Sequence, residues 1–476
     1  MKYEAVIGLE VHVELSTVSK LFCTCPAKFG TEQNKNVCPA CCGMPGMLPV
    51  TNKKVVELGM KAGMMLNCDI NRVTTFDKKN YYYPDLPSAY QTTQWFAPIS
   101  VNGYVDIETS SGPKSIRIEQ IHMEEDAGKL VHDDWTDTTL VDFNRTSVPL
   151  IEIVSEPDLS SAEEVVAYLK RLRDLLRFAK VSNCRWEQGS MRCDVNISLR
   201  EAGTDGLGVR SEIKNMNSLS AITRAIDYEI ARHTDALARG TEELVQETRK
   251  WDDVKDRSYA MRTKETAGDY RYFPDPNVMP IVIDDDWYST VNASLPMLPE
   301  EKRAAYIELG LSEKDAEQLT ESIAFCDVFD AAFEVCGQAK EVSNWLISDC
   351  MAVLNKKQMT IDELAIDGTA LGQIIKLISE DKIARSNGKK ILDSLFEGEI
   401  ISDVEEYAKS KGMIISGDTG EIDAVIAAAI AANPKAVEDY KAGNEKAINA
   451  IFGQCMKELK GNCNPKTLRE MLMKAL

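Results

Sequence analysis

The chain has 476 residues, a formal net charge of −20, 44% hydrophobic residues and 27% charged residues. This length indicates roughly two to four domains with ample cores. The acidic balance excludes the wide basic surface of a stand-alone nucleic-acid binder, and the absence of a run of about eighteen apolar residues excludes a transmembrane helix.

The first predicted element is a strand over residues 3–15. Its early start leaves no room for a signal peptide, so we expect a cytoplasmic protein without membrane association. Because side chains alternate along a strand, Glu10, His12 and Glu14 share one face, opposite an apolar face. Two carboxylates on either side of an imidazole repel each other unless a cation lies between them. Taken alone, an ordinary solvated face with a chance histidine is the alternative.

A cysteine cluster over residues 23–42 has metal-binding spacing. Its candidate ligands form a C-x-C and a C-x-x-C pair: Cys23, Cys25, Cys38 and Cys41. Four thiolates close tetrahedrally on Zn²⁺ and leave no open position, which favours a structural role. Cys42 is a spare that can replace Cys41. Reduced free thiols or a redox pair are the alternatives, and most of the other cysteines are typical of small core residues.

Acidic residues recur in later predicted strands. Residues 121–129 contain three consecutive acids, and Glu152 stands alone in the apolar run 148–154, where an unpaired carboxylate is costly to bury. Two further strands alternate acids with basic or amide residues and carry Arg192, Asp194, Glu212 and Lys214. Together they predict one acidic sheet face, and oxygen ligands with a single histidine suit Mg²⁺ or Mn²⁺.

Local signals place turns and helices between these strands. Asn102-Gly103 predicts a hairpin turn. Amphipathic helices are predicted over residues 161–180, behind a capping box, and over 219–237. His233 of the second helix has charged neighbours in the sequence, so we expect it to face solvent.

The predicted fold class is α+β. Residues 1–293 form a β-sheet-based domain backed by helices, residues 294–405 an all-α domain, and residues 406–476 a small helical tail. The tail is locally basic through Lys457, Lys460 and Lys466, which predicts contact with phosphates. A solvated helix face is the alternative for these lysines.

Five segments give the chain a resemblance to a known family: 8–15, 76–85, 122–129, 142–158 and 269–276. In composition, order and spacing they resemble the B subunit of the aspartyl/glutamyl-tRNA amidotransferase, and the resemblance extends from the first residue to the last. It implies a glutamine-hydrolysing carbon–nitrogen ligase that binds misacylated Glu-tRNA(Gln), and often Asp-tRNA(Asn). Such a protein phosphorylates the side-chain carboxylate of the tRNA-bound amino acid with ATP and Mg²⁺. Ammonia then displaces the phosphate, supplied by the amidase (A) subunit of a heterotrimer that also contains a small (C) subunit.

With this resemblance, we expect His12, Glu125 and Glu152 to be Mg²⁺ ligands, with Glu10 as a ligand or a carboxylate behind them. Glu125 is favoured over Glu124 because only one of two adjacent strand residues faces the site.

No phosphate-binding G-x-x-x-x-G-K-[ST] loop is present in the sequence, so ATP must be held another way. We expect Asp194 and Glu212 to hold a second Mg²⁺ with the ATP phosphates, assisted by Arg192 and Lys214.

The remaining expected roles concern ammonia and the tRNA end. Lys79, near Tyr81 and Tyr82, is expected to line the passage of ammonia, although the tyrosines are also typical of a core. Arg271 and Tyr272 are expected to hold the acceptor end by stacking on its terminal adenine.

Two other functions remain open at this point. A non-catalytic, zinc-stabilised tRNA-binding module accounts for the cysteines and the basic tail but leaves the acidic face unexplained. A metal-dependent phosphohydrolase accounts for the acidic face but leaves the helical residues from Ser294 onward without a role.

Overall fold

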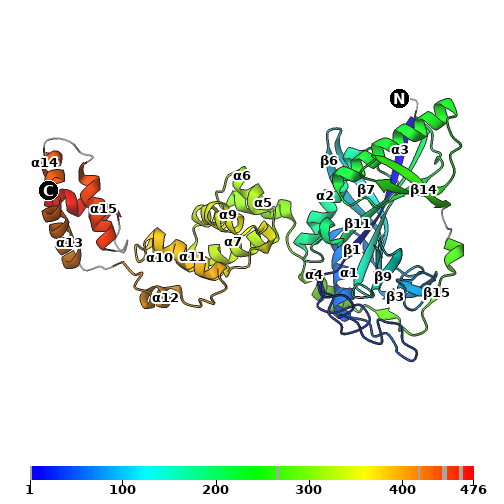
Figure 1. Ribbon diagram of the computed structural model, residues 1–476, viewed down its shortest axis with the longest axis horizontal. Helices are drawn as coiled ribbons and strands as arrows, with labels where there is room; N and C mark the ends of the chain where they lie inside the picture. Colours follow the sequence, from blue (N-terminus) through cyan, green and yellow to red (C-terminus); the bar gives the residue numbers. More distant parts are fainter. Residues whose placement is uncertain (1–2, 134, 264–266, 416–418, 442–446, 460–464) are drawn as a thin grey trace. The chain divides into compact units, whose positions relative to one another are not determined.

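The computed structural model describes residues 3–133, 135–263, 267–415, 419–441, 447–459 and 465–476. Contacts divide the chain into two compact units, Met1–Pro296 and Met297–Leu476. The first unit is built on β-sheets and the second is helical, which confirms the predicted α+β class (Figure 1). Among the described residues, no helix has both the length and the apolar character needed to cross a membrane.

A nine-stranded sheet forms the centre of the first unit. From edge to edge its strands are β14 (Arg257–Thr263), β13 (Glu247–Asp252), β12 (Ser211–Lys214), β11 (Met191–Glu201), β1 (Tyr3–Glu14), β10 (Pro149–Ser155), β7 (Gly112–Glu125), β6 (Ser100–Thr109) and β2 (Asp69–Ile70). Neighbouring strands are antiparallel except β12 and β13, which are parallel. The N-terminal strand is therefore an interior strand of the sheet.

The predicted alternation along β1 is confirmed. Leu9, Val11 and Val13 are buried, whereas His12 and its neighbours on the other face are partly exposed. The helices α1 (Lys53–Met65), α2 (Ala162–Phe178) and α3 (Leu219–Arg239) pack against the sheet (Figure 1). The partly exposed side chains of β1, His12 among them, lie on the opposite face.

Both predicted amphipathic helices are present. The helix α2 is capped by Ser161, whose hydroxyl accepts a hydrogen bond from the backbone N–H of Glu164 at 3.2 Å. In α3, the hydroxyl of Ser218 caps the first turn in the same way.

The predicted hairpin turn at Asn102-Gly103 is wrong. Strand β6 continues through both residues, and its pairing with β7 skips Asn102, which has a positive φ of 57°. A β-carbon on Gly103 would clash with the sulfur of Cys68 and would lie 2.7 Å from the carbonyl oxygen of Leu66. The register of β6 with β7 is unchanged on either side of Asn102, so the glycine is required by close packing within the strand rather than by a turn.

The prediction that His233 faces solvent is also wrong. Its side chain is buried, and its Nε2 lies 3.0 Å from the hydroxyl of Ser211. His233 follows Ile222, Ile226 and Glu229 at helical spacing, so it lies on the face of α3 that packs on the sheet. Its polar neighbours in the sequence lie on other faces of the helix.

Smaller elements complete the first unit. They are the sheet of β15 (Phe273–Pro274), β4 (Asp77–Asn80) and β5 (Tyr90–Thr93), the pair of β16 (Ile281–Val282) and β3 (Val73–Thr74), the hairpin of β8 (Lys129–Asp133) and β9 (Thr138–Asp142), and α4 (Asp285–Ala293). Short 3₁₀ turns occur at Trp186–Gln188 and Ala267–Tyr270.

The second unit is helical throughout its described residues. Its helices are α5 (Pro299–Glu308), α6 (Glu313–Leu319), α7 (Ile323–Cys336), α8 (Ala339–Asn344), the π-helix Trp345–Cys350, α9 (Met351–Lys357), the 3₁₀ turn Ile361–Glu363, α10 (Gly368–Ser379), α11 (Arg385–Phe396), α12 (Val404–Ser410), α13 (Thr419–Ala432), α14 (Pro434–Lys441), α15 (Ile448–Glu458) and α16 (Pro465–Ala475).

The end of this unit has a hydrophobic cluster of its own. The cluster runs from Ile422 to Leu472. The helix α12 instead contacts α10, and the backbone N–H of Ile415 donates to the carbonyl oxygen of Lys382 at 2.8 Å. We therefore place the start of the tail after Ile415 rather than at residue 406.

Candidate functional site

A row of polar side chains crosses the interior strands of the large sheet. Strand register places Arg192 of β11, His12 of β1, Glu152 of β10 and His122 of β7 side by side. Residues directly opposite each other in paired strands point to the same face, so all four side chains share one surface. Glu124 lies two residues after His122 and joins them.

The central group of this row is compact. Nδ1 of His12 lies 3.2 Å from a carboxylate oxygen of Glu124 and 3.9 Å from one of Glu152. Nε2 of His122 lies 3.2 Å from the same Glu152 oxygen. One ligand atom from each of His12, Glu124 and Glu152 lies within 4.8 Å of the other two. Two carboxylates and an imidazole at this spacing fit Mg²⁺ or Mn²⁺.

Electrostatic coupling shows how closely these groups interact. Burial by itself lowers the pKa of His12, but the carboxylates of Glu152 and Glu124 outweigh it and raise this pKa to about 9. Burial by itself raises the pKa of Glu152, but His122 and His12 outweigh it and hold this pKa below its ordinary value. A positive charge is thus stabilised at the position where the three groups meet.

The expectation that Glu125 faces this group is corrected by the register of β7. Glu124, not Glu125, lies beside His12, because it shares a face with His122 and hence with Glu152. The carboxylate of Glu125 points to the other side of the strand and accepts a hydrogen bond from the backbone N–H of Thr92 at 2.9 Å. Burial raises the pKa of Glu125. It lines a separate polar cavity of about 180 Å³ together with Thr92, Asp126 and Asp275.

A second carboxylate group lies further along the same face. Glu10, Asp194 and Glu212 each bring an oxygen within 4.8 Å of the others. The Nζ atom of Lys214 bonds the carboxylate of Asp194 and lies 3.2 Å from Glu212. Burial by itself lowers the pKa of Lys214, but Asp194 and Glu212 outweigh it and raise this pKa. Asn196 donates its amide N–H to Glu10 at 2.9 Å.

A larger cavity opens beside the second group. It has a volume of about 650 Å³, and its lining includes Glu10, Asn196, Arg210, Leu207 and Val245. This size lies within the range of small-molecule and cofactor pockets, roughly 300–1,000 Å³. The lining combines apolar side chains with acids and amides.

Arg192 faces the site but is already paired. Its guanidinium donates to the carboxylate of Asp126 at 2.9 Å, and Arg145 lies 3.6 Å from the same oxygen. Asp126 raises the pKa of Arg192, since it stabilises the charged form. The ion pair with Asp126 therefore holds the guanidinium of Arg192 at the edge of the site nearest Glu14, away from the group formed by Glu10, Asp194 and Glu212.

The expected ammonia and acceptor residues lie near one another. The Nζ atom of Lys79 lies 4.8 Å from the ring centroid of Tyr270 and 5.8 Å from that of Tyr81. Tyr272 stacks on Trp95 with ring centroids 4.6 Å apart. The Tyr272 ring also contacts that of Tyr270, with ring centroids 5.9 Å apart.

Arg271 adopts a positive φ of 47° and is exposed. Its carbonyl oxygen accepts a hydrogen bond from the side-chain amide of Asn80 at 2.8 Å, which fixes the backbone beside Tyr272. The guanidinium is therefore presented from an anchored segment.

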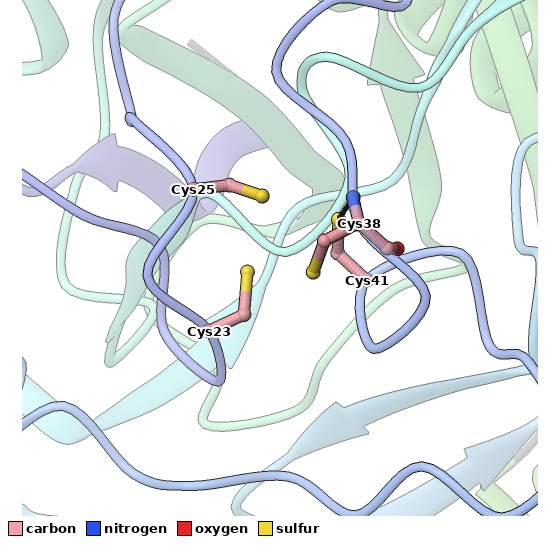
Figure 2. A group of neighbouring side chains, drawn as sticks. All are labelled: Cys23, Cys25, Cys38 and Cys41. Atoms are coloured by element: carbon pink, nitrogen blue, oxygen red, sulfur yellow. Dashed lines mark hydrogen bonds between the residues drawn. The ribbon is translucent and has the colours of Figure 1, made fainter.

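The four predicted thiols form a cluster (Figure 2). The sulfurs of Cys23, Cys25, Cys38 and Cys41 lie within 4.8 Å of one another, and the figure shows them converging from two chain segments. The backbone N–H of Cys38 donates to the sulfur of Cys41 at 3.2 Å. The hydrogen bond shared with Cys23 lowers the pKa of Cys41. Four converging thiols in this pattern fit Zn²⁺.

The tail lysines are only partly described. Lys457 is exposed on α15. Lys460 lies outside the described residues, as does the side chain of Lys466.

Three residues of the site were not assigned to it from the sequence: His122, Glu124 and Asp126. The spacing of His122 and Glu124 was a usable signal for this site, because residues two positions apart in a strand point to the same face of the sheet. The choice between Glu124 and Glu125 required the pairing of β7 with β10, which is a long-range contact.

Together, the fold and the site define an α+β protein whose central sheet presents histidine and carboxylate groups beside a large cavity. The sequence matches two family descriptions, the GatB/GatE catalytic domain over residues 5–289 and the GatB domain over residues 327–476. The chain belongs to the family of the B subunit of the aspartyl/glutamyl-tRNA(Asn/Gln) amidotransferase, which confirms the resemblance noted in its motifs.

Relatives of that name match the chain over its length. The protein from Agathobacter rectalis is 48% identical over 475 residues, covering 100% of this chain and 99% of the relative. The protein from Lachnoclostridium phytofermentans is 47% identical with the same coverage. The protein from Caldicellulosiruptor bescii is 46% identical over 480 residues, again covering 100% and 99%.

Proposed function

We propose that this chain is the component that activates and amidates the amino acid of a misacylated tRNA. Its substrate is Glu-tRNA(Gln), and Asp-tRNA(Asn) where the cell forms it, as the names of its relatives suggest. It works in a heterotrimer with an amidase (A) subunit plus a small (C) subunit. The observation that carries this proposal is the presence of two carboxylate groups on one sheet face, next to a cavity of about 650 Å³.

The reaction consists of two transfers. An oxygen of the substrate's side-chain carboxylate attacks the γ-phosphorus of ATP, the bond to ADP breaks, and an acyl phosphate forms. Ammonia then attacks the acyl carbon, phosphate leaves with the bonding electrons, and the proton lost by the nitrogen passes to the phosphate. Phosphoryl transfer of this kind depends on positioning and on neutralising charge.

Each group of residues has a role in this scheme. Glu10, Asp194 and Glu212 would hold Mg²⁺ beside the cavity, whose apolar side chains would receive the base of ATP. His12, Glu124 and Glu152 would hold a second Mg²⁺ near the substrate carboxylate. When bound, these ions supply positive charge against the phosphate oxygens.

The chain's own cations complete the site. Lys214 lies between Asp194 and Glu212 and is within reach of phosphates bound there. Arg192 and Asp126 fix the wall of the site beside His12. We propose that Lys79 and the cavity lined by Glu125 lie on the route by which ammonia arrives, because Lys79 is close enough to His122 and Glu152 to act on their charges and Glu125 directly follows Glu124.

The sequence contains neither a glutaminase Cys–His pair nor an amidase Ser–Ser–Lys signature, so ammonia must come from a partner. Zn²⁺ at the four cysteines is proposed to stabilise the fold without taking part in the reaction. Arg271 and Tyr272 are proposed to hold the acceptor end, and the helical tail to hold the body of the tRNA.

The assay of the proposed function is direct. The chain is assembled with its partner subunits and incubated with Glu-tRNA(Gln), ATP and glutamine. Formation of Gln-tRNA(Gln) that requires both ATP and Mg²⁺ would support the proposal. Binding of tRNA without amidation would favour the non-catalytic module instead, and ATP hydrolysis that is indifferent to tRNA would favour a phosphohydrolase.

A further inference from the structure

Glu212 of the second carboxylate group accepts a hydrogen bond from a residue that does not belong to this group. The hydroxyl of Thr248 in β13 donates to an oxygen of Glu212 in β12 at 2.7 Å. Both side chains are buried, and the two residues are direct partners in the parallel pairing of the two strands. This is a fixed, water-excluded contact.

The two oxygens of the Glu212 carboxylate have different partners. One oxygen, Oε2, accepts the hydrogen bond from Thr248, while the other, Oε1, lies 3.2 Å from the Nζ atom of Lys214. Threonine is β-branched, so its side chain has few rotamers and holds a hydroxyl in one direction. Thr248 thus anchors one oxygen while Lys214 contacts the other, and the carboxylate stays within the group formed with Glu10 and Asp194.

Strand β13 is itself held in place from the helix side. Arg249, the residue after Thr248, donates to the hydroxyl of Ser258 at 2.6 Å and lies 3.3 Å from the buried carboxylate of Glu229 in α3. The hydroxyl of Thr248 therefore belongs to a strand that a buried ion pair holds in place. Strand β12, which carries Glu212, has only four residues.

We propose that Thr248 is a positioning residue that sets the orientation of Glu212 for binding Mg²⁺ and the phosphates of ATP. This inference rests on the proposed function, because it deepens the role of the Glu10, Asp194 and Glu212 group. Residues that hydrogen-bond a metal ligand from behind orient it, and their loss commonly lowers metal affinity by roughly 10- to 100-fold.

A purely structural role for Thr248 makes a different prediction, and the strand of Glu212, β12, offers a matched control. Ser211 precedes Glu212 and points to the opposite face, where its hydroxyl accepts from Arg232 at 2.9 Å and lies 3.0 Å from Nε2 of His233. Replacing Ser211 by alanine removes a buried hydrogen bond from β12 without touching Glu212. If Thr248 acted only through strand stability, both substitutions would have the same effect.

The experiment measures binding of ADP to the assembled complex by calorimetry at a low and a high Mg²⁺ concentration. The variants are Thr248→Val, Thr248→Ser and Ser211→Ala, with the thermal midpoint recorded for each. Thr248→Ala removes the same hydroxyl with a smaller side chain, so the comparison survives if valine does not fit.

We expect Thr248→Val to weaken Mg²⁺-dependent ADP binding about tenfold, with the larger loss at low Mg²⁺. Thr248→Ser should restore most of the affinity, and Ser211→Ala should leave it unchanged. In steady-state assays the KM for ATP should rise more than kcat falls.

Equal ADP affinity in wild type and Thr248→Val would overturn the inference and leave the proposed function standing. Equal weakening in Thr248→Val and Ser211→Ala would overturn it too, since it would assign the effect to strand stability. If the wild type bound no ADP in the presence of Mg²⁺, the proposed function would fail and this inference with it.

Discussion

The imidazole of His12 and the carboxylate of Glu124 lie 3.2 Å apart, although 112 positions separate them in the chain. They meet because β10 lies between β1 and β7 and places Glu152 opposite both His12 and His122. The same alternation sends Glu125 to the other face of β7. The two adjacent glutamates therefore have different surroundings. Glu124 lies beside His12, whereas Glu125 accepts a hydrogen bond from the backbone N–H of Thr92.

This difference gives the first prediction. Changing Glu124 to Gln keeps the shape of the side chain and removes the charge, so it should abolish most Mn²⁺ binding at the His12 group and ATP-dependent amidation with it. The loss should exceed the roughly 10- to 100-fold effect of residues that lie behind metal ligands. Mn²⁺ affinity is measured by electron paramagnetic resonance, and amidation on the assembled complex.

Glu125→Gln is the matched comparison, because the same substitution is made at the neighbouring residue. It should leave Mn²⁺ affinity close to that of the wild type. Glu108→Gln, at an exposed position of β6, should change neither quantity. Loss of Mn²⁺ binding in Glu125→Gln with retention in Glu124→Gln would reverse the assignment made from the register.

The second prediction concerns the cysteine cluster. Elemental analysis should find about one zinc per chain, and a Cys38→Ser/Cys41→Ser variant should lose it together with thermal stability, since a structural site contributes folding free energy. Cys42→Ser is the control, because Cys42 neighbours the cluster but is not one of the four converging thiols. A wild-type protein that is free of zinc yet fully stable would refute the site.

The third prediction concerns acid stability and the buried carboxylate of Glu229. Burial by itself raises its pKa, but hydrogen bonds from His233 and Arg232 outweigh burial and lower it to about 2. A depressed pKa stabilises the fold above the ordinary value of the carboxyl group, and this stabilisation is lost as pH falls toward 2. Glu229→Gln should therefore cost about 3 kcal/mol at pH 7, and the difference from wild type should shrink below about pH 4.5.

Urea unfolding at several pH values measures this difference. Glu242→Gln is the control: Glu242 also pairs with Arg232, at 2.6 Å, but its side chain is 40% exposed. An exposed pair of this kind contributes less than about 1 kcal/mol. A penalty for Glu229→Gln that stayed constant from pH 7 to pH 3 would show that the charge of this group is not what stabilises the fold.

The features predicted correctly from the sequence are those encoded locally. The alternation of Glu10 and His12 with apolar residues has a period of two and needs no partner strand to be recognised. The cap of α2 at Ser161 is equally local. His233 was within reach of the same reasoning, because counting along the helical period places it on the buried face of α3.

The features that were missed depend on contacts between distant segments. The glycine at position 103 reflects the close approach of Cys68, which no turn statistic contains. Likewise, Arg192 of β11 pairs with Asp126, the residue after β7, although β11 and β7 are not neighbours in the sheet, and the choice of Glu124 follows from the register of β7. Such contacts are decided by packing, so a sequence gives the candidates for them and the structure selects among them.

The last prediction concerns the helical tail. Its hydrophobic cluster, from Ile422 to Leu472, is formed by residues of α13, of α15 with the following Leu459, and of α16, and the backbone of Ile415 is bonded to that of Lys382. Ending the chain after Ile415 should therefore leave α10 and α12 intact and the sheet domain folded. If the tail binds the body of the tRNA, this truncation should raise the KM for Glu-tRNA(Gln) with little change in kcat, because it removes binding made equally in the ground and transition states.

Salt dependence separates a phosphate contact from other uses of the tail. Lys457 and Lys474 are exposed, so Lys457→Ala/Lys474→Ala should lower tRNA affinity and flatten its dependence on salt, since each phosphate contact contributes to the slope. Glu458→Ala, beside Lys457 in α15, is the control and should have neither effect. Steady-state kinetics at two salt concentrations compare the forms. Equal KM values and equal salt slopes for the full-length and truncated chains would show that the tail does not bind tRNA and that its lysines form a solvated surface.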